Sequence, residues 1–112
     1  MSVAYPNEFS QALLNILMNA RDVLEERKVD GPRVMVRMIA ESNRVLVTIA
    51  DNAGGIDKEI LGKVFDPYFT SKGPSKGTGL GLFIAKIIIE KNMDGALTVR
   101  KTGEGAEFRI VI

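Results

Sequence analysis

A glycine-rich segment that leads directly into an apolar run constrains this chain most. Residues 76–82 read Lys-Gly-Thr-Gly-Leu-Gly-Leu, and residues 83–89 continue as Phe-Ile-Ala-Lys-Ile-Ile-Ile. Alternate glycines leave backbone N–H groups uncovered by side chains, and the start of a helix adds the positive end of its dipole. The segment therefore predicts an anion site, best suited to phosphate, at the beginning of a buried helix. The alternative is a flexible glycine hinge before that helix.

Composition narrows the class of protein. The 112 residues are 46% apolar and 26% charged, which suits one small domain with a single core. A formal net charge of +1 leaves no basic excess for a nucleic-acid surface. The chain has neither cysteine nor histidine, which excludes disulfides, thiolate or imidazole metal sites and a phosphohistidine of its own. No apolar stretch has membrane-spanning length and no signal peptide is evident, so we expect a cytoplasmic domain without membrane contact.

Hydrophobic periodicity predicts three helices and four strands. We expect helices at residues 7–28, 57–64 and 80–91, and strands at residues 33–40, 44–50, 96–101 and 106–112. The breaker cluster at residues 29–32 separates the first helix from the first strand, and turn-prone residues at 41–43 and 102–105 favour two hairpins. No repeat or linker divides the chain, so residues 1–112 are expected to form one domain.

A polar stripe runs beside the apolar face of the first predicted helix. Gln11, Asn15, Asn19 and Asp22 are spaced by four, four and three residues, so they point the same way along the helix. Amide and carboxylate oxygens in such a row can coordinate a hard cation or hold a water molecule. A solvated polar face is the alternative, although asparagine is a weak helix former.

A carboxylate follows the second predicted strand. Asp51 is succeeded by the glycine pair Gly54 and Gly55, so the carboxylate can reach into a cleft where the backbone gives way to a flat ligand. An ionised aspartate only accepts hydrogen bonds, which suits an exocyclic amine such as that of adenine. The alternative is an Asx turn that caps the next helix.

Three aromatic residues and two lysines fall between the short helix and the glycine-rich segment. Phe65, Tyr68 and Phe69 lie beside a proline, where they can anchor a loop or pack beside a base. Lys72 and Lys76 flank a short turn-rich stretch, a candidate lid with cations for phosphate oxygens. Solvated loop lysines are the alternative.

Taken together, these motifs make the chain resemble the catalytic, ATP-binding domain of sensor histidine kinases. The superfamily also includes type II topoisomerases, heat-shock chaperone ATPases and mismatch-repair ATPases. Residues 14–20 resemble its N box, 51–56 its first glycine box, 65–69 its phenylalanine box and 77–82 its second glycine box. The resemblance implies the Bergerat ATP-binding fold, an α/β two-layer sandwich with a mixed sheet and helices on one face. Walker and dinucleotide-binding loops are excluded by glycine spacing.

The resemblance also implies a role for each matching residue. Asp51 would accept from the adenine amino group, and Asn19 would coordinate Mg²⁺. Asn15 and Lys72 would be the catalytic positions. The residues implied to bind ATP are Asn15, Asn19, Asp22, Asp51, Ala53, Gly55, Ile56, Phe65, Tyr68, Phe69, Thr70, Lys72, Lys76, Gly77, Thr78, Gly79, Leu80, Gly81 and Leu82. Two alanines depart from the family pattern. Relatives often carry a glycine at the position of Ala53, and at the position of Ala106 they often carry a threonine that helps the residue equivalent to Asp51 hold a water molecule.

Asn15 is informative about the reaction. ATP-hydrolysing relatives carry a glutamate there as the general base for water, and an amide cannot take that proton. The resemblance therefore implies a kinase that passes the γ-phosphoryl group of ATP to a histidine on a separate dimerisation domain, absent from this chain, and then to a response regulator. The domain would be inactive alone, and the parent protein can be membrane-bound. The alternatives are an ATPase, a serine kinase of the anti-sigma-factor type, and a degenerate docking module.

Overall fold

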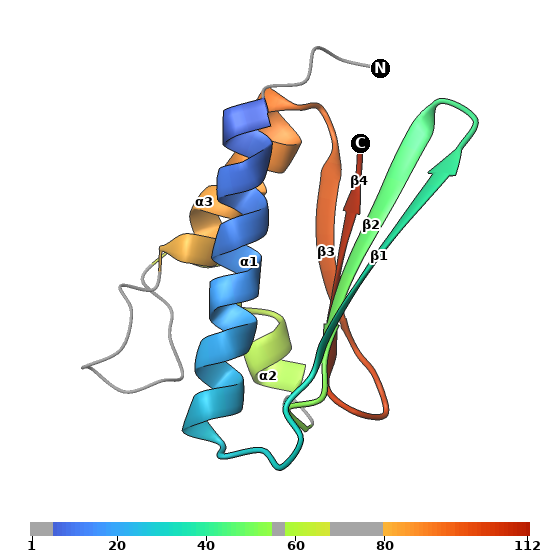
Figure 1. Ribbon diagram of the computed structural model, residues 1–112. Coiled ribbons are helices and arrows are strands. Elements are labelled where there is room, and N and C mark those ends of the chain that lie inside the picture. Colours follow the sequence, from blue (N-terminus) through green and yellow to red (C-terminus); the bar gives the residue numbers. More distant parts are fainter. Residues whose placement is uncertain (1–5, 55–57, 68–79) are drawn as a thin grey trace.

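The computed structural model describes residues 6–54, 58–67 and 80–112 (Figure 1). All seven predicted elements are present. The helices are α1 (Pro6–Glu26), α2 (Lys58–Leu61) and α3 (Gly81–Ile87), and α3 continues into the π-helix η1 (Ile88–Asn92). The strands are β1 (Val34–Glu41), β2 (Arg44–Asp51), β3 (Ala96–Lys101) and β4 (Ala106–Val111). The short predicted helix at 57–64 is a single turn, and the last predicted helix changes to π geometry halfway along.

The apolar face of α1 is buried as its periodicity predicts. Ala12, Ile16 and Ala20 are at most 1% exposed and recur every fourth residue, so they form one line along the helix. The helix ends at Glu26, before the predicted breaker cluster at residues 29–32, and Lys28 and Gly31 adopt positive φ values of 51° and 59°. None of the helices in the described ranges is long and apolar enough to cross a membrane.

The strands form one four-stranded sheet in the order β1-β2-β4-β3. Each of the three pairings is antiparallel, so the expectation of a mixed sheet was wrong in this detail for the described strands. The reason lies in the connections, because β1–β2 and β3–β4 are joined by turns too short for a parallel crossover. The two hairpins then meet through β2 and β4, where Thr48 lies opposite Arg109.

Helices α1 and α3 cover one face of this sheet, which confirms the two-layer α/β sandwich (Figure 1). The core between the layers contains Ile16 from α1, Ile89 from η1, Val47 and Ile49 from β2, and Ile110 from β4. β1 lies at the edge of the sheet and is exposed along its length apart from the half-buried Val34. The other face of the sheet carries no element among the described residues.

The end of the helical layer is set by backbone geometry at Asp94 and Gly95. The Met93 N–H donates to the Ile88 carbonyl at 3.1 Å, and the Gly95 N–H donates to the Ile89 carbonyl at 2.8 Å. A Cβ at position 95 would overlap the Val111 carbonyl oxygen and Ile112, so glycine is required where the chain turns from η1 into β3.

The core packing generates a paired prediction on one helix. Ile16→Ala should lower the free energy of unfolding by about 2–5 kcal/mol, because it leaves a cavity between the layers. Leu14→Ala is the matched control, since Leu14 is 49% exposed on the same helix, and it should cost less than about 1 kcal/mol. Chemical denaturation measures both. Equal losses would contradict the assignment of the buried face.

Candidate nucleotide-binding site

Asp51 ends β2 on the sheet face that the helices cover. It is 9% exposed, and its Oδ1 accepts hydrogen bonds from the Ala53 N–H at 3.0 Å and the Ala106 N–H at 3.3 Å. The first bond forms an Asx-type turn, but it does not cap the next helix as the alternative proposed, because α2 begins only at Lys58. Among the described residues, no donor is bonded to Oδ2. One oxygen therefore fixes the carboxylate, and the other can accept a further hydrogen bond.

The hairpin between β3 and β4 closes tightly over this carboxylate. A Cβ at Gly105 would overlap Asp51 Oδ1 and the Asp51 carbonyl oxygen, and would lie 3.0 Å from the Ala53 nitrogen. The Gly105 N–H donates to Thr102 Oγ1 at 3.0 Å, which holds the turn in shape. From the sequence alone, Gly105 is expected only as a turn residue. Its contact with Asp51 depends on the pairing of β2 with β4, which no local pattern indicates.

The loop after β2 is bound to three other parts of the chain. Arg27 Nη1 at the end of α1 donates to the Ala53 carbonyl at 2.9 Å. The Gly54 N–H, at a positive φ of 93°, donates to the Glu104 carbonyl at 2.9 Å. Asn52 Nδ2 donates to the Gly31 carbonyl at 3.0 Å. These contacts fix the backbone next to Asp51. No local sequence pattern indicates the roles of Arg27 and Asn52, because both side chains contact backbone atoms that are distant in the sequence.

The polar stripe on α1 divides into different roles. Asn15 Nδ2 donates to the Gly81 carbonyl at 3.1 Å, and Asn15 Oδ1 accepts from Gln11 Nε2 at 2.8 Å. Asn15 thus ties α1 to the first turn of α3. Asp22 forms an ion pair with Arg21 Nη2 at 3.2 Å. The side chain of Asn19, half-buried between them, has no hydrogen-bond partner among the described residues.

The start of α3 confirms that the second glycine box leads into a helix. Gly81 is its first residue, and Leu80 precedes it without a side-chain cap. A Cβ at Gly81 would lie 3.8 Å from the Cβ of Asn15, so α1 and α3 approach closely here. Leu82 packs against the core. The predicted backbone anion site therefore begins beside the polar stripe of α1.

Phe65 is held by the core. Its ring meets Phe108 edge to face, with centroids 6.0 Å apart and an interplanar angle of 79°. Lys86 Nζ lies 4.5 Å from the Phe65 ring centroid and donates to the Leu97 carbonyl at 3.1 Å. This geometry favours the anchoring role for Phe65, and its predicted contact with ATP stays a prediction.

The remaining predicted site residues lie outside the described residues. They are Gly55, Ile56, Tyr68, Phe69, Thr70, Lys72, Lys76, Gly77, Thr78 and Gly79. Of the others, the structure brings Asn15 of α1 into contact with Gly81 at the start of α3, places Asp51 and Ala53 together at the end of β2, and packs Phe65 against the core. The described part of the site thus combines a fixed carboxylate, an amide stripe and the first turn of a helix on one side of the sheet.

These features are those of a known family. The family model described as histidine kinase-, DNA gyrase B-, and HSP90-like ATPase matches residues 4–112, and the chain belongs to this family. The resemblance drawn from the four sequence boxes is thereby confirmed. The chain is a histidine-kinase-type ATPase domain, as its curated relatives also indicate.

The relatives are sensor kinases of bacteria. The chain is 39% identical over 105 residues to the two-component sensor PprA of Pseudomonas aeruginosa, covering 91% of this chain and 11% of that protein. It is 36% identical to the sensor histidine kinase ZraS of Salmonella typhi, covering 96% of this chain and 22% of that protein. It is 32% identical to sporulation kinase E of Bacillus subtilis, covering 96% of this chain and 14% of that protein. The chain thus spans less than a quarter of each relative.

Solved structures agree with the fold. The mycobacterial sensor histidine kinase MprB superposes with a TM-score of 0.78 at 30% identity, over 97% of this chain and 72% of that one. The nucleotide-free catalytic domain of histidine kinase ThkA superposes with a TM-score of 0.82 at 28% identity, over 97% of this chain and 68% of that one. Both similarities extend over nearly all of this chain.

The site geometry predicts that alanine substitutions at two glycines of one turn differ sharply in their effect on stability. Gly105→Ala should displace the Asp51 carboxylate and lower the free energy of unfolding by about 1–3 kcal/mol, because the new methyl group overlaps backbone and carboxylate atoms. Gly103→Ala is the matched control, since a Cβ there meets nothing within 4 Å. Thermal unfolding of both variants measures the difference. A neutral Gly105→Ala would show that Asp51 is not held as described.

Proposed function

We propose that this domain binds ATP with Mg²⁺ and supplies the γ-phosphoryl group to a histidine on a separate dimerisation domain. A P–N bond to the imidazole forms as the bond from the γ-phosphorus to the bridging oxygen breaks, and ADP leaves. Because the chain itself contains no histidine, the acceptor must come from elsewhere. The relatives named as two-component sensors support a response-regulator receiver domain as the next acceptor, and a cytoplasmic site of action.

The fixed carboxylate of Asp51 carries the proposal. Its Oδ1 is occupied by two backbone donors, and no described donor competes for Oδ2. A carboxylate held in this way presents one acceptor in a constant direction, which suits the adenine amino group. Ala53, only 6% exposed, adds a small apolar wall beside it. Since the acceptor is charged, a bond to the base would be stronger than one between neutral groups.

Asn19 is the residue that we assign to Mg²⁺. Its amide oxygen is not engaged by any described residue, and Asn19 lies one helical turn after Asn15, whose amide contacts the first residue of α3. No cluster of three or more histidine, cysteine or acidic residues occurs in the described ranges. A single amide oxygen as the protein ligand fits Mg²⁺, because this ion commonly takes few protein ligands and completes its octahedron with phosphate oxygens and water. The bound ion would neutralise charge that develops on the phosphates.

Asn15 supports transfer to an external nucleophile. Its amide donates to the Gly81 carbonyl and accepts from Gln11, so both ends are engaged in positioning α3. An amide has no basicity to activate a water molecule. Without a base at this position of α1, the domain would hold ATP in position and leave the nucleophile to its partner.

The helical surface offers a place for that partner. Leu14 and Met18 on α1 and Ile84 on α3 are 49%, 41% and 40% exposed, respectively, on two helices that pack together. Exposed aliphatic side chains on adjoining helices are typical of protein contacts. We assign this helical patch, defined by Leu14, Met18 and Ile84, to the phosphoacceptor domain, because α1 also carries Asn15 and Asn19.

Nucleotide titration tests the adenine assignment. Asp51→Asn should weaken ADP and ATP-analogue binding about tenfold to a hundredfold, since it replaces a charged acceptor worth about 1.5–3 kcal/mol with an amide. The asparagine can keep the backbone bonds to Ala53 and Ala106, so the fold should persist. Asp94→Asn, an exposed site with a positive φ, is the matched control. Calorimetry that finds unchanged affinity in Asp51→Asn would place the base elsewhere.

Phosphotransfer tests the reaction itself. With Mg²⁺, γ-labelled ATP and a histidine-bearing dimerisation domain from a relative, we expect an acid-labile, alkali-stable phosphate on that domain and none when its histidine is replaced. Met18→Glu should reduce transfer several-fold without changing nucleotide affinity, because a charge in the helical patch opposes docking. Acid-stable phosphate would favour the serine kinase, and release of inorganic phosphate alone would favour the ATPase.

A further inference from the structure

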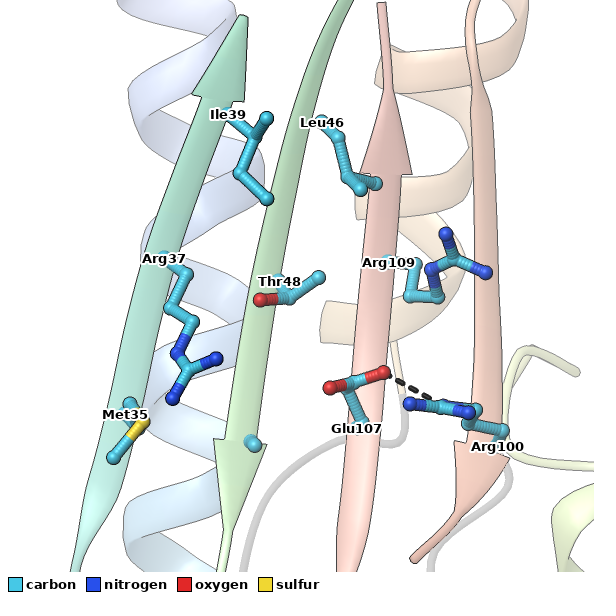
Figure 2. A pocket seen from close by; sticks show the side chains of 9 residues that line it. Met35, Arg37, Ile39, Leu46, Thr48, Arg100, Glu107 and Arg109 are labelled. Carbon is cyan, nitrogen blue, oxygen red and sulfur yellow. Dashed lines mark hydrogen bonds and ion pairs between the residues drawn. The ribbon is translucent and has the colours of Figure 1, made fainter.

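The sheet face opposite the helices carries a shallow groove that the nucleotide site does not use. The groove has a volume of ≈ 470 Å³ and is lined by residues from all four strands (Figure 2). Side chains alternate between the two faces of a strand, so these residues point away from Asp51 and the core. A sheet normally buries an apolar face against a further layer. We call this hollow the outer groove. Since no further layer of the described residues covers it, its side chains are candidates for binding a partner.

The strand register arranges the outer groove in rows. In the middle row, Arg37 of β1 lies opposite Thr48 of β2, and Thr48 lies opposite Arg109 of β4. Figure 2 shows the three side chains next to one another across the sheet. Neighbouring strands are about 4.8 Å apart, so the two arginines start roughly 10 Å from each other. Both are exposed, and neither forms an ion pair with a described residue.

The rows on either side differ in character. Towards the β1–β2 turn, Ile39 pairs with Leu46 and Leu46 with Val111, which makes an apolar row. On the other side, Glu107 is already engaged by Arg100 through a 2.7 Å Nε–Oε1 contact. Glu107 therefore does not neutralise Arg37 or Arg109. The outer groove thus offers two guanidinium groups, neither paired with a carboxylate of the described residues, directly beside an aliphatic strip.

We propose that the outer groove docks an acidic amphipathic helix of a protein partner. Aliphatic side chains of that helix would lie on Ile39 and Leu46, and its carboxylates would meet Arg37 and Arg109. An arginine accepts a carboxylate with two parallel N–H donors, and Thr48 between them adds a hydroxyl. Helix-in-groove docking combines these same elements, an apolar seam with flanking charges.

Two other occupants fit the groove less well. An anionic membrane surface is commonly bound by four to eight clustered cations, whereas this face also carries Glu107 and the whole chain has a formal net charge of only +1. In a dimer with the two sheets stacked face to face, the arginines of one copy would lie against the arginines or against the aliphatic row of the other. The first arrangement is repulsive, and the second removes charges from water without a partner. The concave shape and the mixed rows therefore favour the acidic helix.

The experiment uses a synthetic helical peptide of about 18 residues with a leucine stripe flanked by glutamates. Added to the isotope-labelled full chain, it should shift the amide resonances of β1, β2 and β4 with a dissociation constant below about 1 mM, as expected for a weak, small interface. The matched peptide with lysine in place of each glutamate should bind at least about tenfold more weakly, because it reverses the charge complementarity. Shifts confined to α1 and α3, or no binding at 1 mM, would overturn the proposal.

Paired variants make the test specific to this face. Arg37→Glu/Arg109→Glu should weaken the acidic peptide at least about tenfold and leave ADP affinity unchanged. Lys63→Glu/Lys91→Glu makes the same change in net charge at two exposed lysines away from the groove and should bind as the original chain does. An equal loss of peptide affinity in both double variants would show that the effect depends on overall charge and not on the two groove arginines, which would contradict the proposal. Arginine-dependent sedimentation with phosphatidylglycerol vesicles, without peptide binding, would assign the face to a membrane and overturn the proposal.

Discussion

Burial of one face of the sheet by α1, α3 and η1 is the constraint on which the rest of the structure depends. Val47, Ile49, Phe108 and Ile110 are covered by a helical layer whose central residue, Ile16, is completely buried. Removing this apolar area from water is the main favourable term available to a domain of this size that contains no cysteine for disulfides. It also decides where chemistry can occur, because a strand end beneath the helices places Asp51 at the rim of the core.

The candidate site is organised by backbone atoms more than by side chains. The Asp51 carboxylate is fixed by the N–H groups of Ala53 and Ala106, and the loop beside it by the carbonyls that Arg27 and Gly54 contact. Small residues at 53, 105 and 106 let these segments approach so closely. A rigid acceptor loses little conformational freedom when a ligand binds, so such preorganisation favours affinity.

The two faces of β2 separate two kinds of recognition. Ile49 and Asp51 point toward the helices, whereas Thr48 and Ala50 belong to the outer groove, because successive residues of a strand face opposite ways. A ligand on one face therefore need not displace a ligand on the other. In the two proposals above, the nucleotide would occupy the helix-covered face and the acidic helix the outer groove.

The sequence alone determined the elements, because helix and strand periodicity depends on near neighbours: α1, both hairpins, the helix after the second glycine box and the family were all predicted. It also selected Asp51, Asn15 and Asn19, although their roles toward ATP stay predictions. Only the tertiary structure decided the antiparallel β2–β4 pairing, and with it the contacts of Asp51 with Ala106 and Gly105, more than fifty residues away. The same pairing places Arg109 opposite Thr48, which the β1–β2 hairpin places opposite Arg37. Such contacts follow from register between distant strands, which the burial of a common core selects and no local pattern encodes.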